Sequence, residues 1–182
     1  NSSLMATVFT VKGGINADTI YGGYQGDTII GNGGADDLYG NAGNDTITSG
    51  AGADEIEGNA GADNITSGGG VDTITGGTGN DTINAGACTN TVNDSAGADQ
   101  ITGGNSGIDT INVSTGSDDV SYGSSTDALS MVTITNTTST ADDFTATAGT
   151  TVDSITNFTT TADEIDILST LNAALDAIGD DD

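Results

Sequence analysis

The residues with the clearest chemical capability are aspartates that recur every nine positions. The first uninterrupted series comprises Asp18, Asp27, Asp36, Asp45, Asp54, Asp63, Asp72 and Asp81. Asn90 takes the next position, Asp99 resumes the series, and after a shift of one residue it continues with Asp109, Asp118 and Asp127. Carboxylate oxygens are ligands that hard cations such as Ca²⁺ prefer. The aspartates are therefore the candidate metal ligands of this chain.

The overall composition excludes most other chemistry. The chain has 182 residues, 27 acidic residues against one basic residue (Lys12), no His, one Cys (Cys88) and a net charge of −26. This charge excludes nucleic-acid binding, which needs Lys and Arg, and it must be neutralised by cations for the chain to become compact. Acid–base and nucleophilic mechanisms lack their usual groups, and neither H-E-x-x-H nor G-x-S-x-G occurs, so we expect no enzyme activity. There is no run of 18 apolar residues, so we expect no membrane insertion.

The elements that must position the aspartates follow from the same period. An apolar residue lies two positions after each of the thirteen repeat positions: Ile20, Ile29, Leu38, Ile47, Ile56, Ile65, Ile74, Ile83, Val92, Ile101, Ile111, Val120 and Leu129. Gly lies two positions before the aspartate in most units. Each unit is therefore a Gly-rich turn, an Asp and a short strand with one inward apolar side chain. A fixed short period predicts a solenoid.

Residues 13–130 resemble the RTX calcium-binding nonapeptide family, whose consensus is G-G-x-G-x-D-x-U-x. Residues 76–84 (GGTGNDTIN) match every fixed position. The resemblance implies an all-β fold, a right-handed parallel β-roll (a solenoid) of nine-residue half-turns with calcium in the turns. Units eighteen residues apart would then stack, which gives one stack with Asp18, Asp36, Asp54 and Asp72, and another with Asp27, Asp45, Asp63, Asp81 and Asp99. Isoleucines from the two sheets would meet in a thin core.

The resemblance also implies how calcium is held. Each ion would bridge aspartates of two stacked turns and turn carbonyls, a donor set that suits Ca²⁺ better than Mg²⁺. The regular stacks would hold about seven ions. Because their binding energy would be comparable to the stability of a domain, folding and calcium binding are expected to be one event. Asn90 lacks the charge and its unit has Cys88 where Gly belongs, which indicates a defective site. The off-phase Asp37, Asp94 and Asp119 are interpreted as solvated side chains.

The two ends depart from the repeat. Residues 4–11 predict one strand, and residues 1–12 are interpreted as an N-terminal cap on the roll; the alternative is a strand donated to a neighbouring molecule. After Leu129 the period fails, and residues 131–182 contain DSITNF (153–158) and DEIDIL (163–168). This pattern is similar to the end of the β-roll in serralysin-type proteases, which implies a C-terminal cap and a type I secretion signal. Residues 169–178 predict a short helix.

These features lead to one expected function and one alternative. A Thr-, Ala-, Gly- and Asn-rich chain of this kind resembles type I-secreted surface-layer proteins. We therefore expect a secreted calcium-binding structural protein that folds on Ca²⁺ and binds other copies of itself, as a homo-oligomer, lattice or filament, at the extracellular surface of a Gram-negative bacterium. The alternative is the C-terminal folding and secretion module of a larger RTX toxin, adhesin or hydrolase. A stand-alone calcium buffer would leave the C-terminal pattern unexplained.

Overall fold

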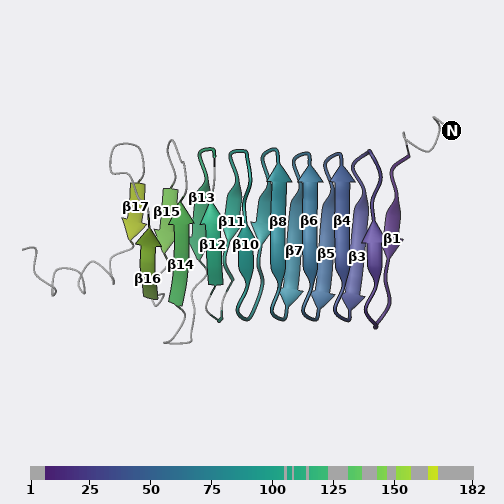
Figure 1. Cartoon of the computed structure of the whole chain (residues 1–182), viewed down its shortest axis with the longest axis horizontal. Coiled ribbons are helices and arrows are strands. Elements are labelled where there is room, and N and C mark those ends of the chain that lie inside the picture. Colours follow the sequence, from purple (N-terminus) through teal and green to yellow (C-terminus); the bar gives the residue numbers. More distant parts are fainter. Residues whose placement is uncertain are drawn as a thin grey trace, which may run out of the picture.

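The fold is a parallel β-solenoid made of two sheets that face each other. The structure is a computed structural model that describes residues 7–104, 106–107, 109–113 and 115–122, and the backbone of four further strands between residues 131 and 167. The strands lie side by side along the long axis of the molecule, and the chain alternates between the two sheets at every turn (Figure 1). The predicted parallel β-roll is confirmed.

Odd-numbered strands form one sheet and even-numbered strands form the other. The first sheet contains β1 (Thr10–Lys12), β3 (Thr28–Gly33), β5 (Thr46–Ala51), β7 (Asn64–Gly69), β9 (Thr82–Asn84), β11 (Gln100–Thr102), β13 (Asp119–Tyr122), β15 (Asp143–Ala146) and β17 (Glu164–Ile167). The second sheet contains β2 (Thr19–Tyr21), β4 (Asp37–Ala42), β6 (Glu55–Ala60), β8 (Thr73–Thr78), β10 (Thr91–Asn93), β12 (Asp109–Val113), β14 (Met131–Asn136) and β16 (Thr151–Thr156).

The register of the sheets follows from the sequence period. Ile29 pairs with Ile47, and Ile47 with Ile65, so that each layer adds eighteen residues and places the same repeat position above itself. The extra residue before Asp109 changes this step to nineteen, and Val92 pairs with Ile111. Parallel pairing therefore continues through the phase shift, because the strands keep their alignment and the turn absorbs the insertion.

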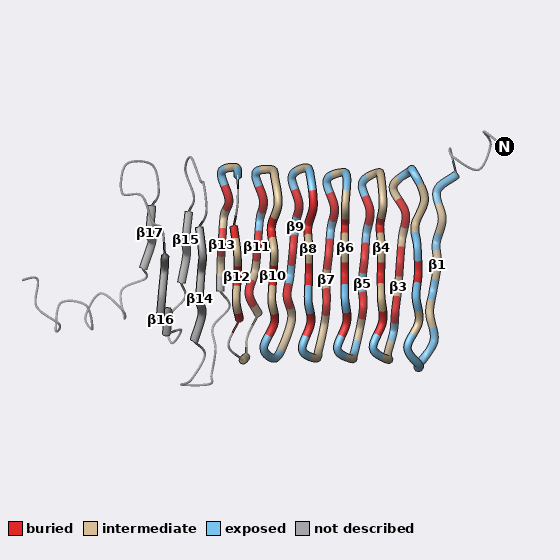
Figure 2. Tube along the Cα trace, viewed as in Figure 1, coloured by how far each residue is buried: buried red, intermediate tan, exposed pale blue. Residues whose placement is uncertain are grey.

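The core is a row of branched apolar side chains between the sheets. In the described part of the roll one from each half-turn is buried, as predicted: Ile20, Ile29, Leu38, Ile47, Ile56, Ile65, Ile74, Ile83, Val92, Ile101, Ile111 and Val120. Leu129, the last predicted position, lies outside the described residues. Buried positions alternate with half-buried or exposed positions along most of the strands (Figure 2). Ser49 and Ser67 are also buried, and each donates its hydroxyl to a backbone carbonyl eighteen residues later. The core is thus thin, but every layer between Ile20 and Val120 contributes to it.

The ends of the roll differ in part from the expectations. β1 covers Thr10–Lys12 and so shares only residues 10–11 with the strand predicted over residues 4–11; residues 7–9 are not in a strand, and the earlier residues lie outside the described part. β1 pairs with β3 of the same chain.

Beyond residue 130, β14 and β16 extend one sheet and β15 and β17 the other. The predicted helix over 169–178 lies outside the described residues. Within the described residues, no helix has the length and apolarity needed to cross a bilayer.

Candidate calcium-binding turns

The repeated aspartates form two hydrogen-bonded ladders, one at each row of turns. In every rung the Oδ1 atom accepts the backbone N–H of the repeat position in the preceding layer, for example Asp36 N to Asp54 Oδ1 at 2.9 Å and Asp45 N to Asp63 Oδ1 at 2.7 Å. One ladder runs through Asp18, Asp36, Asp54, Asp72, Asn90 and Asp109. The other runs through Asp27, Asp45, Asp63, Asp81, Asp99 and Asp118. Both stacks expected from the sequence form, and Asp109 and Asp118 extend them; Asp127 lies outside the described residues.

The second carboxylate oxygen of most of these aspartates has no donor. The Oδ2 atom is buried and receives no hydrogen bond in Asp36, Asp45, Asp54, Asp63, Asp72, Asp81 and Asp99. A buried acceptor without a donor costs about 1–3 kcal/mol, and more when it is charged. A whole row of such atoms therefore indicates that a positively charged partner belongs there.

Glycine keeps open the space that these oxygens face. A Cβ atom added to Gly31 would lie 2.5 Å from Asp36 Oδ2 and 2.6 Å from the carbonyl oxygen of Ser49, in the next layer. At Gly58 the same atom would lie 2.5 Å from Asp63 Oδ2 and 2.5 Å from the carbonyl oxygen of Gly76. A carboxylate of one turn and a carbonyl of the stacked turn thus converge on one small space. This oxygen-only environment fits Ca²⁺, which binds carboxylates and backbone carbonyls in flexible geometry.

The pKa values of the buried aspartates also indicate that a cation belongs in the turns. Burial raises the pKa of Asp45 and of Asp81 to about 6, against the backbone hydrogen bonds that lower it, and the neighbouring carboxylates of the same ladder raise it further. Burial likewise raises the pKa of Asp63 and Asp72. The charged forms are therefore disfavoured in the protein alone, and a bound cation would reverse this because it favours the ionised carboxylate.

Asn90 shows what the turn does without a carboxylate. Its Oδ1 accepts the N–H of Asp72 at 2.9 Å, as the aspartates do in their ladders. Its Nδ2 donates to the carbonyl oxygen of Ala85 at 2.7 Å, with longer contacts to those of Ala87 and Cys88. The Asn90 amide thus donates hydrogen bonds to turn carbonyls that could otherwise bind a cation, which agrees with the defective calcium site expected here. Cys88 has a φ of 80°, a conformation that favours Gly.

The expectation that Asp94 is only solvated is wrong. Asp94 is buried, and its carboxylate lies close to those of Asp99 and Asp118. It occupies the inward position two residues after Val92, where the earlier turns of the same row have Gly22, Gly40, Gly58 and Gly76. The signal was available in the sequence as an acidic residue at a Gly position. The other two off-phase aspartates, Asp37 and Asp119, are half-buried and lie at the starts of strands β4 and β13.

Comparison with known families agrees with this geometry. The model of the RTX calcium-binding nonapeptide repeat (four copies) matches residues 12–47, 39–74, 48–83, 66–101 and 89–106, which together span more than half of the chain. The matched residues include both aspartate ladders from Asp18 to Asp99. No curated protein and no solved structure shows significant similarity to the chain.

Proposed function

Because the chain belongs to the RTX family of calcium-binding nonapeptide repeats, we propose that it is a secreted structural protein that folds on Ca²⁺ and assembles with other copies of itself at the surface of a Gram-negative bacterium. It has no catalytic role in this proposal. Its partners are the type I secretion machinery during export and neighbouring copies of the chain afterwards. About seven Ca²⁺ ions fill the regular stacks.

The observation that most directly supports calcium-driven folding is the row of buried aspartate Oδ2 atoms that have no hydrogen-bond donor. Stacked layers are about 4.8 Å apart, so carboxylates of like charge repeat along each ladder at close spacing. Without cations their repulsion opposes the roll, and the Gly-rich turns add a large entropic cost of ordering. With cations the same oxygens become ligands. The calcium concentration outside the cell would then decide when the chain folds.

The first layers of the roll support self-assembly. In the described residues β1 pairs only with β3 and β2 only with β4, which leaves the outer edge of each strand without a neighbour. Four large apolar side chains near this end are exposed: Val8, Ile15, Tyr21 and Tyr24. Open strand edges and exposed apolar side chains are features through which a β-solenoid can add another copy. This end is the contact region that the proposal favours.

A calcium titration that records circular dichroism and light scattering on one sample tests the proposal. We expect the β-signal and the particle size to rise together, and we expect Mg²⁺ at the same concentrations to produce neither change. A β-signal that rises while the particles stay monomeric would refute self-assembly and favour the alternative role, a folding and secretion module of a larger RTX protein. A chain that gains no β-structure at millimolar Ca²⁺ would refute calcium-driven folding itself.

A further inference from the structure

One turn of the roll contains a carboxylate where the four preceding turns of its row have glycine. In the row that links even-numbered to odd-numbered strands, the inward position five residues before the repeat aspartate is Gly in four successive turns, and Asp94 takes that position in the fifth. At Gly58 a Cβ atom would come within 2.5 Å of Asp63 Oδ2, and at Gly76 within 2.7 Å of Asp81 Oδ2. A side chain at this position therefore meets the aspartate of its own turn.

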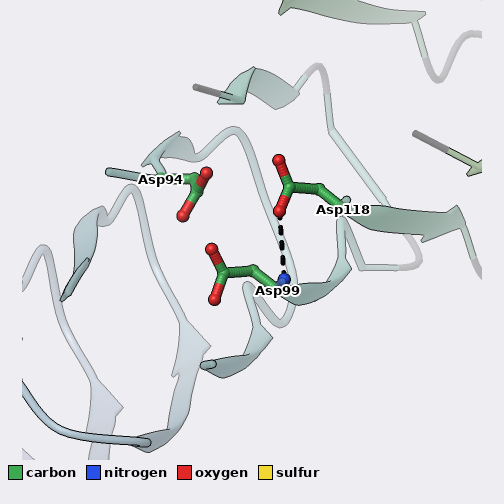
Figure 3. Close-up of side chains that lie close together, drawn as sticks. All are labelled: Asp94, Asp99 and Asp118. Carbon is green, nitrogen blue, oxygen red and sulfur yellow. Dashed lines mark hydrogen bonds between the residues drawn. The ribbon is translucent and has the colours of Figure 1, made fainter. Parts of the chain in front are cut away.

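Asp94, Asp99 and Asp118 form a compact buried group. One oxygen from each carboxylate lies within 4.8 Å of the others, and all three residues are buried. Figure 3 shows the carboxylates of Asp94 and Asp99 directed at each other, with Asp118 beside them from the next layer. Asp118 is tied to the group because its Oδ1 accepts the N–H of Asp99 at 3.0 Å. Asp94 is anchored by its own N–H, which donates to the carbonyl oxygen of Asn112 at 2.9 Å.

The oxygens of Asp99 give an independent indication that a ligand belongs here. Asp99 is 2% exposed; its Oδ1 accepts the N–H of Asp81 at 2.6 Å, while its Oδ2 is buried and receives no hydrogen bond. The carboxylate of Asp94 has an oxygen within 4.8 Å of a carboxylate oxygen of Asp99. Asp94 therefore adds negative charge where an acceptor already has no donor.

We propose that Asp94, Asp99 and Asp118 form a three-carboxylate cation site that binds Ca²⁺ more tightly than the ordinary turns of the same row. The inference rests on calcium binding by the turns, and it assigns Asp94 as a ligand that the nine-residue repeat does not supply. Calcium affinity in proteins rises with the number of charged ligands. A third carboxylate is therefore expected to tighten this site by about tenfold or more, so that it fills first and empties last.

The test is isothermal titration of Ca²⁺ into the chain, compared among the unaltered protein, Asp94→Gly, Asp94→Asn and Asp37→Asn. Asp94→Gly restores the residue that the row uses elsewhere, and should lose the tight step while the total number of ions stays the same. Asp94→Asn should lose the same step. Asp37→Asn removes an equal charge outside the repeat positions and should keep it. Circular dichroism at saturating Ca²⁺ establishes that each variant is folded.

A second measurement uses the unaltered chain and does not depend on variants that fold. In calcium-loaded protein labelled with ¹³C at the aspartate side chains, stepwise addition of a chelator should change the signals of Asp94, Asp99 and Asp118 last. The inference is overturned if these signals change with or before those of the other turns, or if Asp94→Gly and Asp94→Asn titrate as the unaltered chain does. In both cases calcium-driven folding would still stand. If the unaltered chain binds no Ca²⁺, the proposed function fails as well.

Discussion

Replacing Asp63 by Asn should change the stability of the roll in opposite directions with and without calcium. Asp63 lies in the middle of its ladder, and its Oδ1 accepts the N–H of Asp45 at 2.7 Å. An Asn at this position keeps that acceptor and replaces Oδ2 by an amide nitrogen. Asn90 shows the expected result, because its Nδ2 donates to the Ala85 carbonyl at 2.7 Å. The backbone of the turn can therefore stay as it is while the cation ligand is lost.

The two opposing magnitudes follow from this geometry. At a calcium concentration ten times the dissociation constant, one site contributes about 1.4 kcal/mol to the free energy of unfolding, and Asp63→Asn should remove it. Without calcium the same change removes a buried acceptor that has no donor. This should stabilise the roll by about 1–3 kcal/mol. The variant is therefore expected to be less stable than the unaltered chain in calcium and more stable in its absence.

Urea unfolding followed by circular dichroism measures both free energies. The calcium-free series should contain sucrose, which favours the compact state and keeps a folded baseline. Asp37→Asn is the matched control, since it removes the same charge from a half-buried position at the start of β4. The reasoning is refuted if Asp63→Asn destabilises the calcium-free roll, or if Asp37→Asn reproduces the loss seen in calcium.

Three further predictions concern the ladders, the core and pH. Asn90→Asp should create a calcium site and raise the number of bound ions by one in a titration; an unchanged number would contradict the role assigned to the Asn90 amide. Ile65→Asp should prevent folding even at high calcium, because Ile65 is fully buried and the change puts a charge into a thin core; a normal β-spectrum would contradict this. Burial raises the pKa of Asp45 and Asp81 from 3.8 to about 6, so between these values the folded chain retains protons that the unfolded chain releases. The calcium-free roll should therefore become more stable on acidification from about pH 7 to about pH 4.5, whereas acid should weaken the calcium-loaded roll because protons compete for the ligands. Thermal unfolding at both pH values checks this, with sucrose in the calcium-free samples to keep the roll folded at the start. A calcium-free roll that loses stability in acid would contradict it.

Most of the fold could be predicted because it depends on a simple period. An apolar residue two positions after each aspartate determines which side chain points inward, and eighteen residues per layer determine the stacking of Asp36 on Asp54. The first follows from the repetition, and the second is what the resemblance to the RTX family implies; neither needs knowledge of any individual contact. The insertion before Asp109 did not disturb this, since the turn absorbs one residue and the ladder continues from Asn90 to Asp109.

The features that were missed depend on orientation within a turn. Asp94 lies outside the nine-residue phase of the aspartates, which favoured a solvated side chain, although its place at a Gly position two residues after Val92 is the signal that marks the position as inward. The strands β3, β4 and β6 extend past the predicted apolar residue, and Asn32, Asn41 and Asn59 within them adopt positive φ, which Asn tolerates better than most residues. The start of β1 at Thr10 depends on pairing with β3, and propensity alone placed it too early.

The eighteen-residue layer has a consequence for how such a chain can change its length. Insertion or deletion of one layer would leave the cross-section, the sheet assignments and both ladders intact, and would lengthen or shorten the rod by about 4.8 Å. Insertion or deletion of nine residues would instead move every later strand to the opposite sheet. If it occurred between residues 81 and 90, the turn that contains Asn90 would then stack on the ladder of Asp81, and the turn that contains Asp94 on the ladder of Asp72. Genes for rolls of this kind are therefore expected to grow and shrink by pairs of repeats, and the length of the rod is a property that duplication can adjust without redesign of any contact.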